Sequence, residues 1–335
     1  MLVVTLFVMV VLSLLTLSLG YRASLEGRAV RHRVAGIQLQ AQSRSAVAIA
    51  LARLAADDND FDHPAEPWCA ETSLTDEDWL PEWSKTLPDG QQEFTAAVRI
   101  VDEQRKLDIR SATPKALEKL GLSPVQIQSA LDWMDSDNNT NLQGAEDDYY
   151  MHQPLSSRCK NADLEFMDEL AMARGFSLAE RQGQAGGEEA DEADSPYPIR
   201  PAEGLGQPGW YYLLRTVGEP RKININTAPQ AVLETLPLSP GAVEQIIGYR
   251  RPGAGSADSL EGAVFRTMED VEHLQGLTET DVAALGVVAA FRSTEFRIYA
   301  ETLHAPSRLR YRLEVLVHRE PGQPIQVMQW KVGAL

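Results

Sequence analysis

The densest group of possible metal ligands in the chain lies at residues 135–148. Carboxylate and amide side chains recur there at short intervals, and their oxygens are the ligands that a hard cation such as Ca²⁺ prefers. These residues are Asp135, Asp137, Asn139, Asn141, Glu146, Asp147 and Asp148. Counted from Asp135, oxygens stand at positions one, three, five and seven, with Glu146 at position twelve, which is EF-hand spacing. The sequence therefore predicts calcium as the cofactor.

The segment departs from an EF-hand in two respects. Position six is Thr140 where an EF-hand has glycine, and the glycine of this segment is Gly144. No strong helical pattern follows directly, because residues 149–154 intervene. We therefore expect a calcium loop of its own kind. A solvated acidic loop at the end of a helix is the alternative.

Other chemistry is sparse in the sequence. There is no G-x-S-x-G motif, no P-loop and no histidine pair at metal-binding spacing, so we expect no enzyme. The two cysteines, Cys69 and Cys159, could form one disulfide in an oxidising compartment or remain thiols in a reducing one. An anchored, exported domain favours the disulfide, although the sequence does not show that the two residues lie close together.

The charge balance argues against nucleic acid as a partner. Acidic residues outnumber basic ones 48 to 31, giving a net charge of −17. Such a surface repels phosphate backbones and suits divalent cations.

The elements that position the acidic loop include an internal repeat. Residues 108–134 recur as residues 224–250, with Ser111 and Thr227 expected to cap a first short helix and Ser123 and Ser239, each followed by proline, a second. Two helix-turn-helix, SAM-like units are predicted, and the loop at 135–148 directly follows the first.

The second repeat also resembles helix-hairpin-helix DNA-binding modules such as those of competence proteins. Its hairpin, residues 236–241, carries prolines where those modules offer backbone amides to a phosphate. Few cations surround it. A membrane-anchored DNA-binding protein of a DNA-uptake system is therefore the alternative function, and a fold reused for protein contacts is the favoured one.

Residues 1–21 carry no charged side chain and are long enough to cross a bilayer as a helix. A secretory signal peptide is the competing interpretation, but no charge precedes the apolar run. We expect the helix to continue for roughly fifty residues or more and to end at residues 57–60. Its domain-facing stripe is predicted from apolar spacing at Val30, Val34, Ile37, Ala41, Ala48, Leu51 and Ala55.

Segments in which apolar and polar side chains alternate predict a sheet, and these segments come from both ends of the soluble part. Residues 94–101 and 106–109 are expected to pair around a turn, and residues 296–303, 309–318 and 324–332 to form three antiparallel strands. The fold class is therefore α+β: a long transmembrane, pilin-like helix on a small antiparallel sheet, with a large all-helical insertion. Four parts are expected: the transmembrane part of the helix at 1–21, and the rest of the helix with a loop and the first strands at 22–107. The inserted helical domain is expected at 108–290, with a flexible linker at 183–194, and the C-terminal strands at 291–335.

Three motifs together carry a family resemblance. They are residues 132–137 (DWMDSD), residues 144–150 (GAEDDYY) and residues 223–228 (ININTA). With the order of elements, they resemble the general secretion pathway protein K family, the minor pseudopilin K of bacterial type II secretion. The resemblance implies a pilin-like helix on a small sheet, an inserted helical domain and calcium bound in that domain.

The resemblance also implies partners and a location. Family members sit at the tip of a periplasmic pseudopilus, bound to the I and J minor pseudopilins, where they are thought to begin assembly and help export folded proteins through the outer membrane. The major pseudopilin and prepilin peptidase are further expected partners, and the expected location is the bacterial inner membrane, single-pass, with the soluble part in the periplasm. The family lacks the glutamate that most pilin-like subunits carry at the fifth mature position. Thr5 occupies that place if Met1 is the mature start. The basic leader that prepilin peptidase removes is not seen before Met1, and the arginines after residue 21 oppose the expected orientation by the positive-inside tendency.

Overall fold

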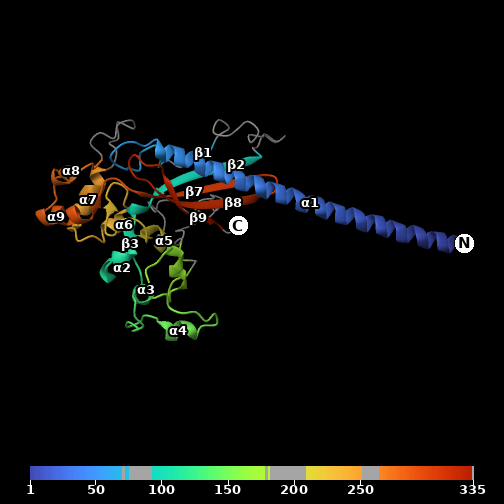
Figure 1. Cartoon of the computed structure of the whole chain (residues 1–335), viewed down its shortest axis with the longest axis horizontal. Coiled ribbons are helices and arrows are strands. Elements are labelled where there is room, and N and C mark those ends of the chain that lie inside the picture. Colours follow the sequence, from blue (N-terminus) through green and yellow to red (C-terminus); the bar gives the residue numbers. More distant parts are fainter. Residues whose placement is uncertain (70–71, 75–92, 178–179, 182–208, 251–263, 334–335) are drawn as a thin grey trace.

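The computed structural model describes residues 1–69, 72–74, 93–177, 180–181, 209–250 and 264–333. The linker predicted at 183–194 lies outside these residues. Two bodies are visible in Figure 1, a long helix lying on a sheet and a group of short helices beyond the end of that sheet.

The chain begins with a single helix, α1, Leu2–Ala55. Its first buried residue is Ala35, so its N-terminal half projects away from the rest of the molecule (Figure 1). The expected length of more than fifty residues is confirmed. The expected domain-facing stripe is wrong, because Val30, Val34 and Ile37 remain 61%, 49% and 62% exposed.

The buried face of α1 is instead rich in small side chains, which let the helix approach the sheet closely. It consists of Ala35, Leu39, Gln42, Ser43, Ala46, Val47, Ala50 and Leu54. Ser43 is included because it finds a partner there: the hydroxyls of Ser43 and Thr302 lie 2.6 Å apart. A stripe chosen by hydrophobicity alone misses that pairing.

The sheet has five antiparallel strands in the order β1-β2-β7-β8-β9. They are β1 (Thr72–Leu74), β2 (Phe94–Asp102), β7 (Glu295–His304), β8 (Leu309–His318) and β9 (Gln326–Val332). The α1 helix packs on β2, β7 and β8. Residues from both ends of the chain thus form one core, which includes Ala46, Val98, Ile298 and Val315. The predicted α+β class, with a long helix on an antiparallel sheet, is confirmed.

The predicted pairing of 94–101 with 106–109 is wrong. After β2 the chain makes a 3₁₀ turn, Glu103–Arg105, because the Asp102 carboxylate accepts a hydrogen bond from the Gln104 amide at 2.7 Å. The next strand, β3 (Leu107–Asp108), therefore leaves the sheet and runs parallel to β4 (Leu214–Arg215).

Between β2 and β7 the described chain is mainly helical. Its helices are α2 (Pro114–Lys119), α3 (Pro124–Met134), α4 (Asp147–Met151), the 3₁₀ helix Met167–Met172, α5 (Trp210–Leu213), α6 (Gln230–Leu233), α7 (Pro240–Tyr249), α8 (Met268–Glu272) and α9 (Glu279–Val288). The insertion is not all-helical as predicted, because β5 (Ile223–Asn224) and β6 (Ala289–Ala290) form a second short parallel pair besides β3 and β4.

The N-cap residues of the short helices agree with the predicted ones only in part. Ser123 begins α3, as the serine followed by proline predicts, and the structure adds a capping box between Ser123 and Gln126. The cap of α2 is Thr113 rather than Ser111, and α6 follows Pro229 rather than Thr227. Both repeats contribute to one core that includes Leu117, Ile127, Trp133, Leu233 and Ile246.

Candidate functional site

The acidic loop spans the gap between α3 and α4. Asp135 is the C-cap of α3, and Glu146 is the N-cap of α4. Asp132, one turn before the end of α3, is fully buried beneath the loop. Single carboxylate oxygens of Asp132, Asp135 and Glu146 lie within 4.8 Å of one another. The loop thus gathers three carboxylates at a point that the end of α3 holds in place.

Within this cluster, Glu146 is the residue whose environment most favours a bound cation. Its side chain is 1% exposed, and neither carboxylate oxygen has a hydrogen-bond partner among the described residues. Burial raises the pKa of Glu146, the neighbouring Cys159 thiol lowers it in part, and the charges of Asp132 and Asp135 raise it. A buried carboxylate without a partner is costly, and a cation removes that cost. The residues present therefore fit a hard metal ion.

Gly144 allows the loop to close over α3. A Cβ at this position would lie 2.0 Å from Oδ2 of Asp132, so only glycine fits. The Asn141 amide donates to Asp132 Oδ1 at 3.2 Å, and Asn141 Nδ2 donates to the same oxygen at 2.5 Å. Asp132 therefore organises the loop in addition to contributing a carboxylate.

The other predicted ligands lie around this cluster. Asp137 is exposed and accepts the Asn139 amide at 2.7 Å, and Asn139 is also exposed. Asp147 accepts the Cys159 amide at 2.8 Å, whereas Asp148 is exposed. Of the predicted carboxylates, the structure gathers Asp135 and Glu146.

The sequence reasoning did not include Asp132 among the ligands. The available signal was its spacing of three residues from Asp135, which places both side chains on one side of the last helical turn.

The two cysteines are not joined. Both are free, with Cys69 packed against the core between α1 and the sheet and Cys159 buried in the core of the insertion. The predicted disulfide is absent because the two residues belong to different cores. Burial raises the pKa of the Cys159 thiol to about 12.

The ININTA motif of the second repeat binds the insertion to the end of β2. Oδ2 of Asp102 accepts hydrogen bonds from Thr227 Oγ1 at 2.5 Å, Ser293 Oγ at 2.8 Å and Asn224 Nδ2 at 3.1 Å. We call these four residues the Asp102 hub. Nearby, Asn226 pairs through its amide group with the backbone of Phe265.

Because of these contacts, the motif does not face solvent. Asn224 and Asn226 are fully buried and Thr227 is 6% exposed. The polar side chains of the motif are used for internal hydrogen bonds.

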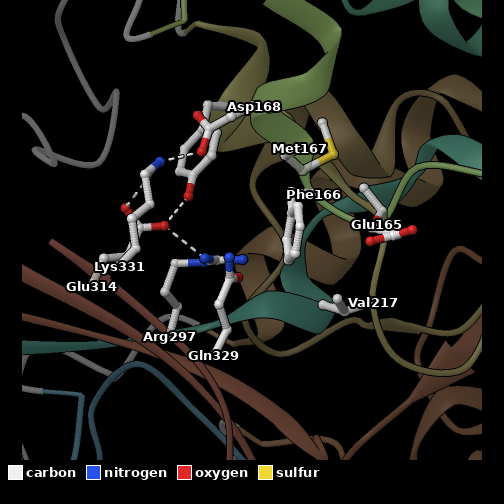
Figure 2. Close-up of a pocket in the computed structure, with 11 residues that line it drawn as sticks. Glu165, Phe166, Met167, Asp168, Val217, Arg297, Glu314, Gln329 and Lys331 are labelled. Atoms are coloured by element: carbon white, nitrogen blue, oxygen red, sulfur yellow. Dashed lines mark hydrogen bonds and ion pairs between the residues drawn. The ribbon is translucent and has the colours of Figure 1, made fainter. Parts of the chain in front are cut away.

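A second contact between the insertion and the sheet surrounds a small pocket. Figure 2 shows Arg297 and Lys331 of the sheet directed toward Glu314 and Asp168. Arg297 donates to Glu314 at 2.6 Å, and Lys331 bonds Asp168 of the 3₁₀ helix. Tyr211 of α5 bonds Glu314 as well. These charges fasten the insertion to β7, β8 and β9.

Within the described residues, α1 is the one helix long and apolar enough to span a membrane. Its most apolar 18-residue window has a mean hydropathy of 2.7 and none of it is buried. Thr5 lies in this part, where its hydroxyl donates to the Leu2 carbonyl at 2.8 Å.

Comparison with known proteins agrees with the resemblance. Residues 98–183, which include α2, α3 and the acidic loop, match the family described as type II secretion system (T2SS), protein K. A structure of similar fold is a chain of the crystal structure of the GspK-GspI-GspJ complex from the enterotoxigenic Escherichia coli type 2 secretion system. It is 16% identical in sequence, with a TM-score of 0.59, and the match covers 91% of this chain and 99% of that one. Among curated proteins, no match was found.

The family match covers the domain that holds the acidic loop, and the shared fold extends to α1 and the sheet. The match of residues 98–183 to the type II secretion system protein K family agrees with the resemblance that the sequence motifs carry.

Proposed function

We propose that this chain is a minor pseudopilin at the tip of the type II secretion pseudopilus, where it begins assembly and helps to export folded periplasmic proteins through the outer membrane. The observation that supports the proposal is a long helix on an antiparallel sheet, in a chain whose residues 98–183 match the protein K family. The I and J minor pseudopilins are its proposed tip partners, by analogy with the complex in which the similar chain was crystallised. The role is structural rather than enzymatic.

The position of the insertion supports a place at the tip. Figure 1 shows α7, α8 and α9 beyond the end of the sheet that is farthest from the N-terminus. In a fibre built by stacking long parallel helices, this bulk would block a further subunit above. Thr5 supports the same place, because it offers no carboxylate to a neighbour's N-terminus. That argument holds for a mature chain that starts at Met1.

The proposed location is the inner membrane, with α1 as a single-pass anchor and the soluble part in the periplasm. An apolar, unburied N-terminal half of α1 supports this placement. Prepilin peptidase is the proposed partner before assembly, and the major pseudopilin is the proposed partner in the assembled fibre.

We further propose that the acidic loop holds calcium. Asp132, Asp135 and Glu146 would provide carboxylate oxygens, with Asp137, Asn139, Asn141, Asp147 and Asp148 close by in the same segment. The ion would supply positive charge to a buried carboxylate that lacks a partner. It would thereby hold the loop against the end of α3.

Purified soluble domains test the tip proposal. Residues 22–335 retain every buried residue of α1, since the first is Ala35. This fragment should co-elute with the soluble domains of its I and J partners in size-exclusion chromatography. It should also fail to bind duplex DNA at low salt, where electrostatic binding is strongest.

The opposite pair of results, DNA binding without a pseudopilin complex, would overturn the proposal. Repeating the chromatography with a calcium chelator separates two effects. Loss of the fragment's own thermal stability would indicate a structural ion, whereas loss of the complex alone would indicate an ion at the interface.

A further inference from the structure

The segment of α1 that follows the apolar span reverses the charge of the rest of the chain. Residues 22–34 carry Arg22, Arg28, Arg31 and Arg33 and one acidic residue, Glu26, whereas the whole chain has 48 acidic and 31 basic residues. All four arginines are exposed. We call these four residues the arginine collar.

The arginine collar surrounds the helix rather than marking one side of it. Successive residues are about 100° apart around an α-helix. Arg22 and Arg33 therefore point to one side, and Arg28 and Arg31 to the opposite side. A cation on all sides suits a surface that surrounds the helix, whereas one partner protein would meet one side.

The position of the collar along α1 specifies which surface that is. Residues 2–21 make about 30 Å of helix, which matches the hydrocarbon thickness of a bilayer. Arg22 then lies at the boundary, Arg28 about 9 Å beyond it, and Arg33 about 17 Å beyond it. Buried contacts with the sheet begin only at Ala35, so the described domain leaves the collar free.

From this juxtaposition we propose that the arginine collar binds the anionic phospholipid headgroups of the leaflet from which α1 emerges. Charge complementarity carries the proposal, because juxtamembrane arginines are attracted to anionic headgroups within about one Debye length, roughly 8 Å at physiological salt. Arg22 lies within that reach, Arg28 lies at its limit, and Arg31 and Arg33 contribute less. The collar would hold the domain at a fixed height above the bilayer. The inference rests on the membrane anchoring proposed above.

The test uses the full chain reconstituted in phosphatidylcholine bilayers that contain a trace of spin-labelled lipid. Electron paramagnetic resonance measures how strongly spin-labelled phosphatidylglycerol associates with the protein relative to spin-labelled phosphatidylcholine. The wild type should prefer phosphatidylglycerol by about two- to five-fold at low salt, and NaCl should weaken the preference. The double variant Arg22→Gln/Arg28→Gln should lose most of it, and Arg31→Gln/Arg33→Gln less.

Arg44→Gln is the matched control. Arg44 is an exposed arginine on the same helix, about 33 Å beyond Arg22, so its removal should leave the preference unchanged. An equal preference in the wild type and the Arg22/Arg28 variant, or loss of preference in Arg44→Gln, would overturn the proposal.

Failure of the anchor itself is distinguishable. A chain that washes off the vesicles at alkaline pH is not inserted, and that result would overturn the anchoring and the collar together. An inserted chain without lipid preference would overturn the collar alone.

Discussion

At the scale of residues, the acidic loop shows which part of a proposed metal site can be inferred from a sequence. The spacing of Asp135 and Glu146 was sufficient to propose a cation site in this loop, and the structure brings their carboxylates together. Asp132 was missed: its spacing from Asp135 was the available signal, but its place beneath the loop depends on the loop folding back over α3. Gly144 allows that close approach, and its role follows only from the 2.0 Å distance that its Cβ would have to Asp132.

Glu146→Gln should abolish the stabilisation that calcium gives to the chain. At a calcium concentration one hundred times Kd, the wild type should gain about 2.7 kcal/mol by linkage, seen as a rise in Tm between chelator and calcium. The exposed residue Asp148 provides the control, and Asp148→Asn should keep most of the rise. A full calcium response in Glu146→Gln would contradict the proposed site.

Gly144→Ala should destabilise the chain even in chelator, because the new methyl group collides with the Asp132 carboxylate. We expect a loss of about 1–3 kcal/mol in the free energy of unfolding. A Cβ at Gly248 of α7 would meet nothing within 4 Å, so Gly248→Ala should be neutral or slightly stabilising. Equal denaturation midpoints for the two variants would refute the close approach.

At the scale of elements, strand and helix locations followed from the sequence more readily than strand partners. The alternation of apolar and polar residues located β7 and β8, and Ser123 followed by proline located the start of α3. The pairing of residues 106–109 was wrong because Asp102 stabilises a turn that sends the chain out of the sheet. The buried face of α1 was wrong because Ser43 and Gln42 count as polar in a sequence and are buried in the structure.

Glu103 should make the junction between β2 and β7 sensitive to acid. Burial alone would raise the pKa of Glu103, but the charges of Arg297 and Lys106 outweigh it and lower the pKa to about 2 from 4.5. A lowered carboxylate pKa contributes stability that is present above pH 4.5 and lost as the pH falls toward 2. The contribution is on the order of 3 kcal/mol.

Glu103→Gln removes this titration. The free energy of unfolding, measured by urea denaturation in chelator from pH 5 downward, should therefore fall less steeply in the variant than in the wild type. The variant should also be less stable at neutral pH, because it leaves the buried Lys106 without its carboxylate partner and Arg297 with Glu314 alone. Parallel pH profiles for the two proteins would show that Glu103 is not the group that titrates.

Thr227→Val should weaken the attachment of the insertion to the sheet. The substitution removes a hydroxyl that donates to the buried Asp102 carboxylate and leaves its shape almost unchanged. A loss of about 1–3 kcal/mol in the free energy of unfolding is expected. Thr95→Val, at an exposed threonine in β2, is the matched control and should change stability by less than about 0.5 kcal/mol. Equal effects of the two substitutions would rule out a stabilising role for the Asp102 hub.

At the scale of the whole molecule, the proposed membrane anchor, the helix and sheet, and the insertion are separate parts of the fold. The N-terminal half of α1 is exposed and apolar, its C-terminal half lies on the sheet, and the insertion is fastened to the sheet through the Asp102 hub and the charges around Glu314. A rigidly attached insertion is what a subunit needs if it is to end a fibre. The sequence motifs indicated the family, but the attachment could be seen only in the structure, because its partners lie far apart along the chain.

The most direct test of the tip proposal is to locate the chain in assembled pseudopili. A gold label on an epitope tag after Leu335 should be found in electron micrographs at one end of each fibre, with one label per fibre. Deleting the chain should reduce the number of fibres that form. Labels distributed along the fibre, or fibres that form equally well without the chain, would contradict a subunit that begins assembly from the tip.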